Sequence, residues 1–493
     1  MKQPNAWLAL LLSASLLGTL SACSPTTPKD GKAGGGGVEQ AKHEPTPSPT
    51  PSYPPEVHPG FGEKLPEGGL FQAGAIKHTI QKGQSTAFLA DRYLKYTDYY
   101  TKNGLKKALV KHNQLGSETL SIGQVLEIPG VRKEPLKATR VKRDKTFDAR
   151  GIYVTQTSAA TERVFTLVKE LKPLGLNTVV FDVKDMDGIV AYPTKVPLAN
   201  SSGARRDTIK DMGKLISMLH DQGIHVVARQ ALFHDNFLAQ KQPRLALQSK
   251  KGGPWREKGR LVWVDPNHPE IQEYNLAIAR ELADLGVDEI QFDYIRFPAM
   301  GDIQNIAYSF DREKVRKDEV ITGFLKRAYE ELKPRGVLVS IDLFGVVAWD
   351  EGVDVKITGQ RMEDLAKYSD IISPMVYPSH FYPPFDGFKY PAWEPYYFVN
   401  QGVLRTAKKT VGTGVVIRPW LQAFPFMVKN RFNADYVATQ IKASYDAGGI
   451  GWLLWDAQNQ YDVGRQGMAR WNTLKATMPP ASPSVAAQAS SSL

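Results

Sequence analysis

The chain has 493 residues, of which 42% are hydrophobic and 10% aromatic, so it can bury a sizeable core and form more than one domain. Its only cysteine excludes an intramolecular disulfide framework and any cysteine-based zinc or iron–sulfur site. The net charge is +11, but residues 1–150, with 21 Lys/Arg and 13 Asp/Glu, carry +8 of it and residues 151–493 only +3. Because a nucleic-acid-binding enzyme places its positive charge on the main domain, no nucleic-acid partner is expected.

Residues 1–23 have the pattern of an export signal. Lys2 precedes an apolar and small-residue run, Ala6 to Leu20, which is too short for a comfortable membrane span. The run ends before Cys23 in small residues, which resembles the lipobox of bacterial lipoproteins, where the cysteine becomes the lipid-modified first residue. We therefore expect a lipoprotein signal peptide, a membrane anchor at Cys23 and a location in the cell envelope, at the outer membrane or the extracellular face of the plasma membrane. An ordinary secretory signal is the alternative.

Residues 24–75 are rich in Pro, Gly, Ser and Thr, and Gly34 to Gly37 form a glycine run. Such a composition cannot bury enough apolar surface to fold, so the segment is predicted to be a disordered tether. The tail, residues 479–493, has a similar composition and the same prediction. No hydrophobic run after Cys23 reaches membrane-spanning length.

A small domain is predicted over residues 76–130. A strand with a turn at Gly83 precedes helically spaced apolar residues, and Gly123 leads into a second strand that ends at Pro129. This strand–helix–helix–strand order, with Lys82-Gly83-Gln84-Ser85 at its start, resembles a LysM domain. The resemblance implies binding to peptidoglycan or another glycan that contains N-acetylglucosamine; a small α/β domain without a ligand is the alternative. Residues 131–147 are basic and are predicted to be a solvated linker that few contacts cross.

Residues 148–478 contain eight short apolar runs that alternate with amphipathic segments, the pattern of a (β/α)8 TIM barrel. The expected strands are Gly151–Thr155, Thr178–Val183, His225–Gln230, Glu289–Asp293, Val337–Asp342, Ile371–Val376, Val415–Trp420 and Gly451–Trp455. A doubly wound sheet would leave two runs unexplained, and no G-x-G-x-x-G follows the first strand. The fold class is therefore predicted as α/β, a TIM barrel preceded by a small α+β domain.

Ionisable and aromatic residues follow the ends of the expected strands, where TIM barrels carry their chemistry. Alternation along a strand places Asp293 on the same face as Gln291, and Asp342 on the same face as Ser340. A carboxylate pair across a barrel mouth suits glycoside hydrolysis, in which one group protonates the leaving oxygen and the other attacks the anomeric carbon or activates water. Asp293 and Asp342 are the predicted catalytic pair. The predicted substrate-binding residues are Asp182, Lys184, Arg229, Tyr294, Arg296, Tyr377, Trp420, Trp455 and Asp456, with Trp349 as a further candidate for stacking on sugar rings.

The segment Gln291–Pro298, sequence QFDYIRFP, is similar to a strand-four signature of bacterial glycoside hydrolase-like barrels long catalogued as a domain of unknown function. Arg150–Tyr153, Phe181–Asp185, Ser373–Pro378 and Gly451–Asp456 also match that family. The resemblance implies a retaining-type relative in which the strand-four aspartate is the nucleophile. Only Asp293 matches the catalytic residues of the wider relatives directly. Some relatives place a catalytic Glu after strand five, where this chain has Asp342, and others place an Asp on strand six, where this chain has Tyr377.

The sequence gives little support to a metal site or to a phosphate-binding loop. His225, His234, Asp235 and His268 fall in one region, but no H-x-H or H-x-x-x-H spacing supports a metal site, so no metal is predicted. No P-loop is present, and no cofactor is expected. The leading prediction is an exported, lipid-anchored glycoside hydrolase acting on a cell-wall or extracellular polysaccharide. The alternative is a catalytically inactive lipoprotein that binds glycans and organises the wall; transglycosylation by the same carboxylates is a third possibility.

Overall fold

The computed structural model describes residues 54–117, 119–349 and 355–477. The expected signal peptide, Cys23, most of the expected tether and the tail lie outside these residues. Within them, no helix is both long and apolar enough to cross a membrane.

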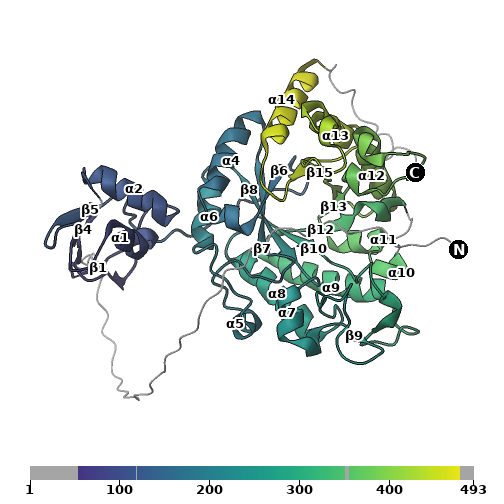
Figure 1. Cartoon of the computed structure of the whole chain (residues 1–493), viewed down its shortest axis with the longest axis horizontal. Coiled ribbons are helices and arrows are strands. Elements are labelled where there is room, and N and C mark those ends of the chain that lie inside the picture. Colours follow the sequence, from purple (N-terminus) through teal and green to yellow (C-terminus); the bar gives the residue numbers. More distant parts are fainter. Residues whose placement is uncertain (1–53, 118, 350–354, 478–493) are drawn as a thin grey trace, which may run out of the picture.

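The main domain is a closed barrel of parallel strands ringed by helices (Figure 1). Its strands are β6 (Arg150–Val154), β7 (Thr178–Lys184), β8 (His225–Ala231), β10 (Glu289–Asp293), β12 (Leu338–Phe344), β13 (Ile371–Met375), β14 (Val416–Ile417), β15 (Trp420–Gln422) and β16 (Trp452–Trp455). The pairing of β16 with β6 closes the barrel. Each predicted run forms a strand, except that the seventh is divided into β14 and β15 at Pro419, which has no N–H to donate to the ladder. The predicted TIM-barrel class is confirmed.

Helices alternate with these strands and cover the outside of the barrel. They are α3 (Gln156–Ala159), α4 (Arg163–Leu171), α5 (Pro197–Ser202), α6 (Met212–His220), α7 (Asn236–Lys241), α8 (Pro269–Asp284), α9 (Lys317–Leu332), α10 (Val355–Thr358), α11 (Met362–Leu365), α12 (Pro395–Lys409), α13 (Ala434–Asp446) and α14 (Asp462–Thr477). The short strands β9 (Gln248–Ser249) and β11 (Ile306–Ala307) pair outside the barrel. Outward-facing strand residues such as Phe292 pack against this helical layer, here against Phe324 of α9.

The small domain contains a three-stranded antiparallel sheet, β3 (Gly69–Gln72), β4 (Ala75–Thr79) and β5 (Val125–Ile128), with the helices α1 (Thr86–Tyr93) and α2 (Lys102–His112). The prediction that residues up to 75 are a disordered tether is wrong for its last part. Besides β3, the strands β1 (Val57–His58) and β2 (Glu63–Lys64) belong to this domain. The reason is burial of apolar surface: Leu65 is buried, and the fully buried His58 ring lies between Phe61 and Phe71.

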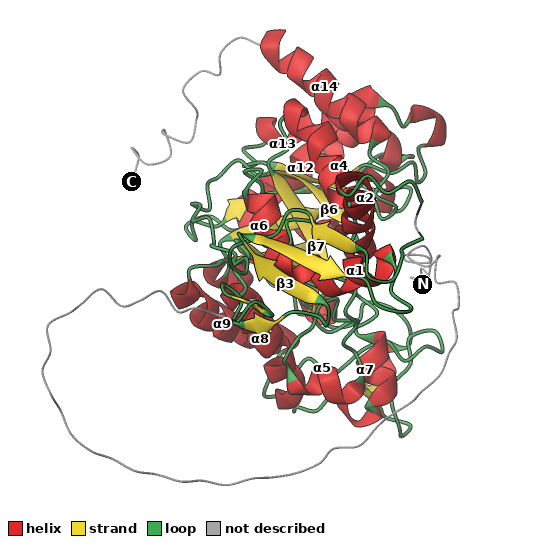
Figure 2. Cartoon of the chain, turned by 90° about the vertical axis from the view of Figure 1, so that its left-hand side faces the viewer, coloured by secondary structure: helices red, strands yellow, loops and turns green. Residues whose placement is uncertain are grey.

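The small domain packs against the barrel, beside α4 and α6 in both views (Figure 1, Figure 2). The buried ammonium of Lys214 in α6 donates to the carbonyls of Leu94, Thr97 and Tyr99 at 2.8, 2.8 and 3.0 Å. Tyr100 donates to the carbonyl of Ala159 at 2.6 Å. The expectation that few contacts connect the two domains is therefore wrong.

The basic linker, residues 131–147, also differs from the solvated connector that was predicted. Arg140 donates to the carbonyls of Val287 at 2.7 Å, Ala283 and Arg335. These carbonyls lie where α8 and α9 end and the next strands begin, so the guanidinium satisfies backbone acceptors that helix ends leave free. The backbone N–H of Val141 donates to Asp288 Oδ1 at 2.9 Å. The positive charge of the linker thus serves to bind it along the amino-terminal end of the barrel.

Candidate active site

Four of the predicted residues meet at the carboxyl ends of adjacent strands. Arg229 on β8 donates one Nη to Asp182 on β7 and the other to Asp293 on β10. Its Nε lies 3.8 Å from Oδ2 of Asp342 on β12. Strand register explains the first contact, because Asp182 is paired directly with Arg229 in the β7–β8 ladder. A single buried guanidinium therefore lies within reach of three carboxylates, and Asp293 and Asp342 are neighbours at the ends of the adjacent strands β10 and β12.

The two predicted catalytic carboxyls are buried, but in different surroundings. Asp342 accepts a hydrogen bond from the indole Nε1 of Trp420 at 2.8 Å, and its residue is 1% exposed. Burial and the charge of Asp293 raise the pKa of Asp342 well above its usual range. Asp293 accepts the backbone N–H of Tyr294 at 2.6 Å and a guanidinium N–H of Arg229. The two carboxyl groups therefore differ in their surroundings: Asp342 has a raised pKa and an indole donor, whereas Asp293 accepts a guanidinium N–H at hydrogen-bonding distance.

Aromatic rings form one side of this cluster. Trp455 stacks on Tyr153 with ring centroids 3.9 Å apart and lies edge-on to Trp420 at 5.3 Å. The hydroxyl of Tyr153 donates to Asp182. Tyr377 belongs to the same apolar cluster and is buried. Such rings could contact the apolar faces of a sugar.

Lys184 does not reach the site, and its predicted role in substrate binding is wrong for this structure. It is fully buried, pairs with Asp235 at 2.8 Å and donates to Asn275 of α8 at 3.2 Å. A bulge between Asp182 and Lys184 explains the error, because it changes the register so that Lys184 pairs with the helix-facing Gln230. Simple alternation would have turned both Asp182 and Lys184 inward.

Two further candidates have close structural partners. The carboxylate of Asp456 accepts the backbone N–H groups of Gln458 at 2.9 Å and Gln460 at 2.8 Å, so it closes the turn after β16. Trp349 donates to Asp386 at 2.6 Å and packs on Phe381 in the core outside the barrel. Both residues have structural partners that strand-end position alone does not reveal.

Tyr294 and Arg296 lie at the edge of the mouth. Tyr294 has a positive φ of 52°, which is rare for a residue with a side chain, and this turn directly follows Asp293. Arg296 is 4% exposed and lies over three aromatic rings, of which Phe344 at the end of β12 is nearest, 4.1 Å from its Cζ. Arg229, and not Arg296, forms the ion pair with Asp293.

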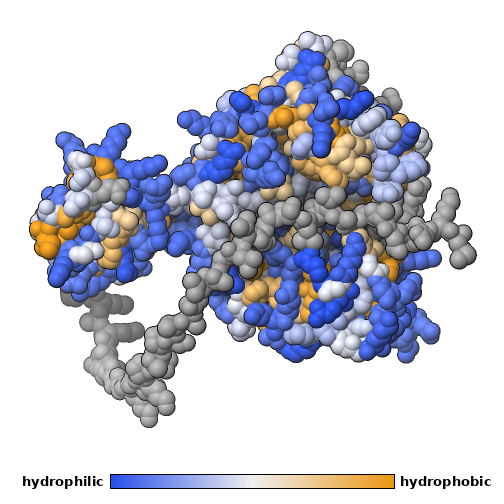
Figure 3. Space-filling model, in the orientation of Figure 1, coloured by the Kyte–Doolittle hydropathy of each residue, from blue (hydrophilic) through white to orange (hydrophobic). Residues whose placement is uncertain are grey.

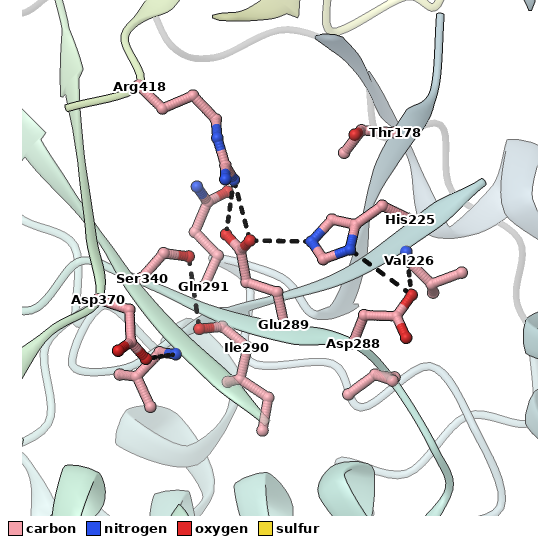
Figure 4. A network of polar contacts seen from close by, with 12 residues as sticks. Thr178, His225, Val226, Asp288, Glu289, Ile290, Gln291, Ser340, Asp370 and Arg418 are labelled. Carbon is pink, nitrogen blue, oxygen red and sulfur yellow. Dashed lines mark hydrogen bonds and ion pairs between the residues drawn. The ribbon is translucent and has the colours of Figure 1, made fainter. Parts of the chain in front are cut away.

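At the opposite end of the barrel, a second buried charge cluster is structural (Figure 4). Glu289 at the start of β10 pairs with Arg418 at 2.9 Å and accepts from His225 Nε2 at 3.0 Å. Burial alone would raise the pKa of Glu289. The charge of Arg418 and the hydrogen bond from His225 outweigh this effect and lower the pKa to about 2. Glu289 is four residues before Asp293, roughly 13 Å along the strand. Arg418, which lies between β14 and β15, therefore binds at this end of the barrel and not at the mouth.

Two groups near the site were not among the predicted site residues. Tyr153 shares the inward face of β6 with Gly151, and the alternation rule applied to Asp293 would have found it. Asp185 follows β7 and accepts from Gln156 of α3; burial and the neighbouring Asp182 raise its pKa to about 7. Among the described residues, no group of three or more His, Cys, Asp or Glu side chains is arranged to hold a metal ion.

Comparison with known proteins identifies the family. Residues 151–461 match the model of the family described as "Putative glycosyl hydrolase domain". A hypothetical protein from Ruminiclostridium thermocellum ATCC 27405 is 36% identical over 39% of this chain and 96% of its own, with a TM-score of 0.36.

Two more distant structures are also similar. The PgaB (BpsB) glycoside hydrolase domain from Bordetella bronchiseptica is 16% identical over 65% of this chain and 98% of its own, with a TM-score of 0.49. The spore cortex-lytic enzyme SleL from Bacillus megaterium QM B1551 is 12% identical over 80% and 85%, with a TM-score of 0.39. Among curated proteins, the search finds no match. Because the family model covers most of the chain, the protein belongs to this glycosyl hydrolase family, and the prediction of a glycoside hydrolase is confirmed at the family level.

Proposed function

We propose that the protein is an exported, lipid-anchored glycoside hydrolase that cleaves a cell-wall or extracellular polysaccharide. The observation that supports this best is the position of Asp293 and Asp342 on the neighbouring strands β10 and β12, where both carboxyl groups lie close to the guanidinium of Arg229. Glycosidase chemistry requires two carboxyl groups a short distance apart, flanking the bond to be cleaved. Export and anchoring are supported by the signal-like residues 1–23 and by the single cysteine of the chain.

In this proposal the carboxyls have separate tasks. Asp342 holds its proton because it is buried beside Asp293, so it acts as the general acid that protonates the leaving glycosidic oxygen. Asp293 acts as the nucleophile and attacks the anomeric carbon. Arg229 neutralises Asp293 in the free protein, and Trp420 orients Asp342 through its N–H group. Trp455 and Tyr153 supply a stacked aromatic wall next to the carboxyls, suited to a sugar ring.

An inactive glycan-binding barrel is the second candidate, and one observation favours it. Arg229 engages Asp182 and Asp293 at the same time, and in the free protein Asp293 and Asp342 are only 5% and 1% exposed. A cluster so fully paired can be structural. The two candidates differ in one respect that can be measured: only the first releases new reducing ends from a glycan.

The small domain supports attachment to the wall. Its order of β4, α1, α2 and β5 matches the predicted strand–helix–helix–strand unit that resembles LysM. At its outer end Ile122 and Val125 are 72% and 56% exposed, and this end carries a hydrophobic patch (Figure 3). Apolar side chains on a small polar domain mark a contact surface. We expect the double variant Ile122→Ser/Val125→Ser to bind insoluble peptidoglycan several-fold more weakly than the wild type, while Lys107→Ser, an exposed change on α2 of the same domain, serves as the control.

The decisive test is a substrate screen with the chain from residue 24 onward, since the small domain packs on the barrel and should be kept. Purified peptidoglycan and a panel of α- and β-linked glycans are incubated with wild type and with Asp293→Asn, and reducing ends are measured. Release by wild type but not by Asp293→Asn supports the hydrolase. If neither protein releases reducing ends and both bind a glycan equally, the inactive glycan-binding candidate is preferred. The anomer of the first product separates retention from inversion, and a sugar acceptor reveals transglycosylation.

A further inference from the structure

Arg296 is a buried cation that forms no ion pair with a carboxylate of the described residues, although the charges of Asp293 and Glu257 act on it from a distance. It is 4% exposed, and the one hydrogen bond that its guanidinium makes among the described residues goes to the carbonyl of Phe297 at 3.2 Å. A guanidinium has five N–H donors, so most of its donor capacity is unused. The other strongly buried arginines of the barrel, Arg229 and Arg418, each pair with carboxylates. Arg296 is the exception within the part of the chain that the structure describes.

The surroundings of Arg296 place it at the barrel mouth. Its Cζ lies 4.1 Å from the ring centroid of Phe344, 4.9 Å from that of Trp263 and 5.3 Å from that of Tyr294. Phe344 ends β12 two residues after Asp342, on the same face of that strand, and Tyr294 directly follows Asp293. The guanidinium of Arg296 therefore lies just beyond Asp293 and Asp342, toward the barrel mouth. It is close to the ends of β10 and β12, the two strands that carry these aspartates.

The backbone here is shaped to hold Arg296 in this position. Tyr294 takes a φ of 52° immediately after the strand, and the N–H of Arg296 donates to the carbonyl of Tyr294 at 2.9 Å. A left-handed conformation at a residue with a bulky side chain costs free energy and tends to be kept at functional positions. His234 adds a wall to the same enclosure, with its ring 4.9 Å from those of Trp263 and Tyr294. Burial lowers the pKa of His234 to about 4, so at neutral pH the imidazole adds no charge to the positive charge of Arg296.

From this arrangement we propose that Arg296 is the anchor of an anion subsite, which binds a carboxylate carried by the glycan substrate at or next to the sugar that is cleaved. The inference rests on the proposed hydrolase function and narrows its substrate class to acidic glycans. A guanidinium matches a carboxylate with two parallel N–H···O bonds, and these are strong in a site that excludes water. The aromatic walls suit the sugar ring that carries the carboxylate. A bound carboxylate would also supply the counter-charge that Arg296 lacks among the described residues.

The alternative is that Arg296 serves only to pack between rings and to balance the charge of Asp293 over a distance. That role predicts the same effect of a substitution on every substrate. An anion subsite predicts an effect only when the ligand carries the carboxylate, so a matched pair of ligands separates the two.

The test is binding of an acidic oligosaccharide and of its carboxyl-reduced form, which differ only in –COO⁻ against –CH₂OH. Calorimetry is performed on the Asp293→Asn protein, which should not turn the ligand over, with Arg296 intact, Arg296→Met or Arg296→Lys. Arg256→Met, which removes an exposed positive charge from the loop before Trp263, is the control for general electrostatics. Thermal melting of each variant establishes that it is folded.

With Arg296 intact, we expect the acidic ligand to bind about 10- to 100-fold more tightly than the reduced one, the range for hydrogen bonds to a charged group. Arg296→Met should bring that ratio close to one while leaving the affinity for the reduced ligand within about twofold, Arg296→Lys should keep part of the preference, and Arg256→Met should keep all of it. Equal binding of both ligands with Arg296 intact, or a preference that survives in Arg296→Met, overturns the anion subsite. If the wild-type enzyme hydrolyses neutral and acidic glycans equally well, only this inference fails; if it neither binds nor cleaves any glycan, the proposed function fails with it.

Discussion

Trp420 donates its indole N–H to Asp342 across the barrel mouth at 2.8 Å, from β15 to β12. The bond joins the candidate general acid to the aromatic side of the site, because Trp420 also lies edge-on to Trp455. A carboxyl held in this way cannot turn freely, and pre-set orientation is what a proton donor in a glycosidase requires. Both ends of the bond are buried, so neither group loses its geometry to water.

Replacing Asp293 by Asn should abolish turnover. Without the nucleophile, activity should fall by at least about 10³-fold with the fold intact, since the amide has nearly the same shape and can still accept from Tyr294 N–H. Initial rates on the best glycan of the screen, together with circular dichroism, measure this. Azide should restore part of the rate and give a product of the opposite anomer to that of wild type. Full activity of Asp293→Asn would rule out the carboxylate-pair mechanism.

The Asp342→Asn variant should lose most activity on substrates with poor leaving groups. An activated aryl leaving group needs little protonation, so its rate should fall far less than that of a natural glycan. The wild-type kcat/KM should decline as the pH rises through the raised pKa of Asp342, and this basic limb should disappear in the variant. A variant equally impaired on all leaving groups would move the acid role elsewhere, first to Asp185, whose pKa is raised to about 7.

The same Asp342→Asn change should stabilise the protein at neutral pH. Because the pKa of Asp342 is raised on folding, its carboxyl keeps a proton in the native state at pH values where the unfolded chain has released it. The free energy of unfolding therefore falls as the pH rises above the unfolded pKa of about 3.9. Asn has no such proton linkage and can still accept from Trp420. We expect a melting temperature about 1–3 °C above wild type at pH 7 and little difference near pH 4. A lower melting temperature at pH 7 would contradict the raised pKa.

Lys214→Met should loosen the small domain from the barrel. Three backbone carbonyls, those of Leu94, Thr97 and Tyr99, lose their donor in a buried interface, and each unsatisfied group costs about 1–3 kcal/mol. Limited proteolysis within residues 131–147 should become faster, with Lys408→Met, which changes an exposed lysine of α12, as the control. Equal cleavage rates in the two variants would mean that Lys214 does not hold the domains together.

Cys23→Ser should release the protein from the membrane fraction or block its maturation. Cys23 is the only thiol of the chain and follows the apolar run of the signal, so no second residue can take the lipid in its place. Fractionation of cells that express each form, followed by immunodetection, measures this. Membrane partitioning equal to that of wild type would refute the lipobox interpretation.

Local pattern in the sequence was sufficient for the barrel and for its most important carboxylates. Eight apolar runs are countable without a structure, and period-two alternation places Asp293 with Gln291 and Asp342 with Ser340, because successive side chains of a strand point to opposite faces. Their position at strand ends follows from the parallel topology.

Only the tertiary structure decided which strand-end groups meet. One bulge after Asp182 turned Lys184 toward α8, and the register between β7 and β8 set Arg229, rather than Arg296, beside Asp293. The positions of the linker and the small domain likewise depend on contacts with residues far away in the chain. One example is Lys214, which donates to backbone carbonyls within residues 94–99. The physical reason is that alternation and composition act within a few residues. Ion pairs, by contrast, depend on distances across strands, which a shift of one residue in register is enough to change.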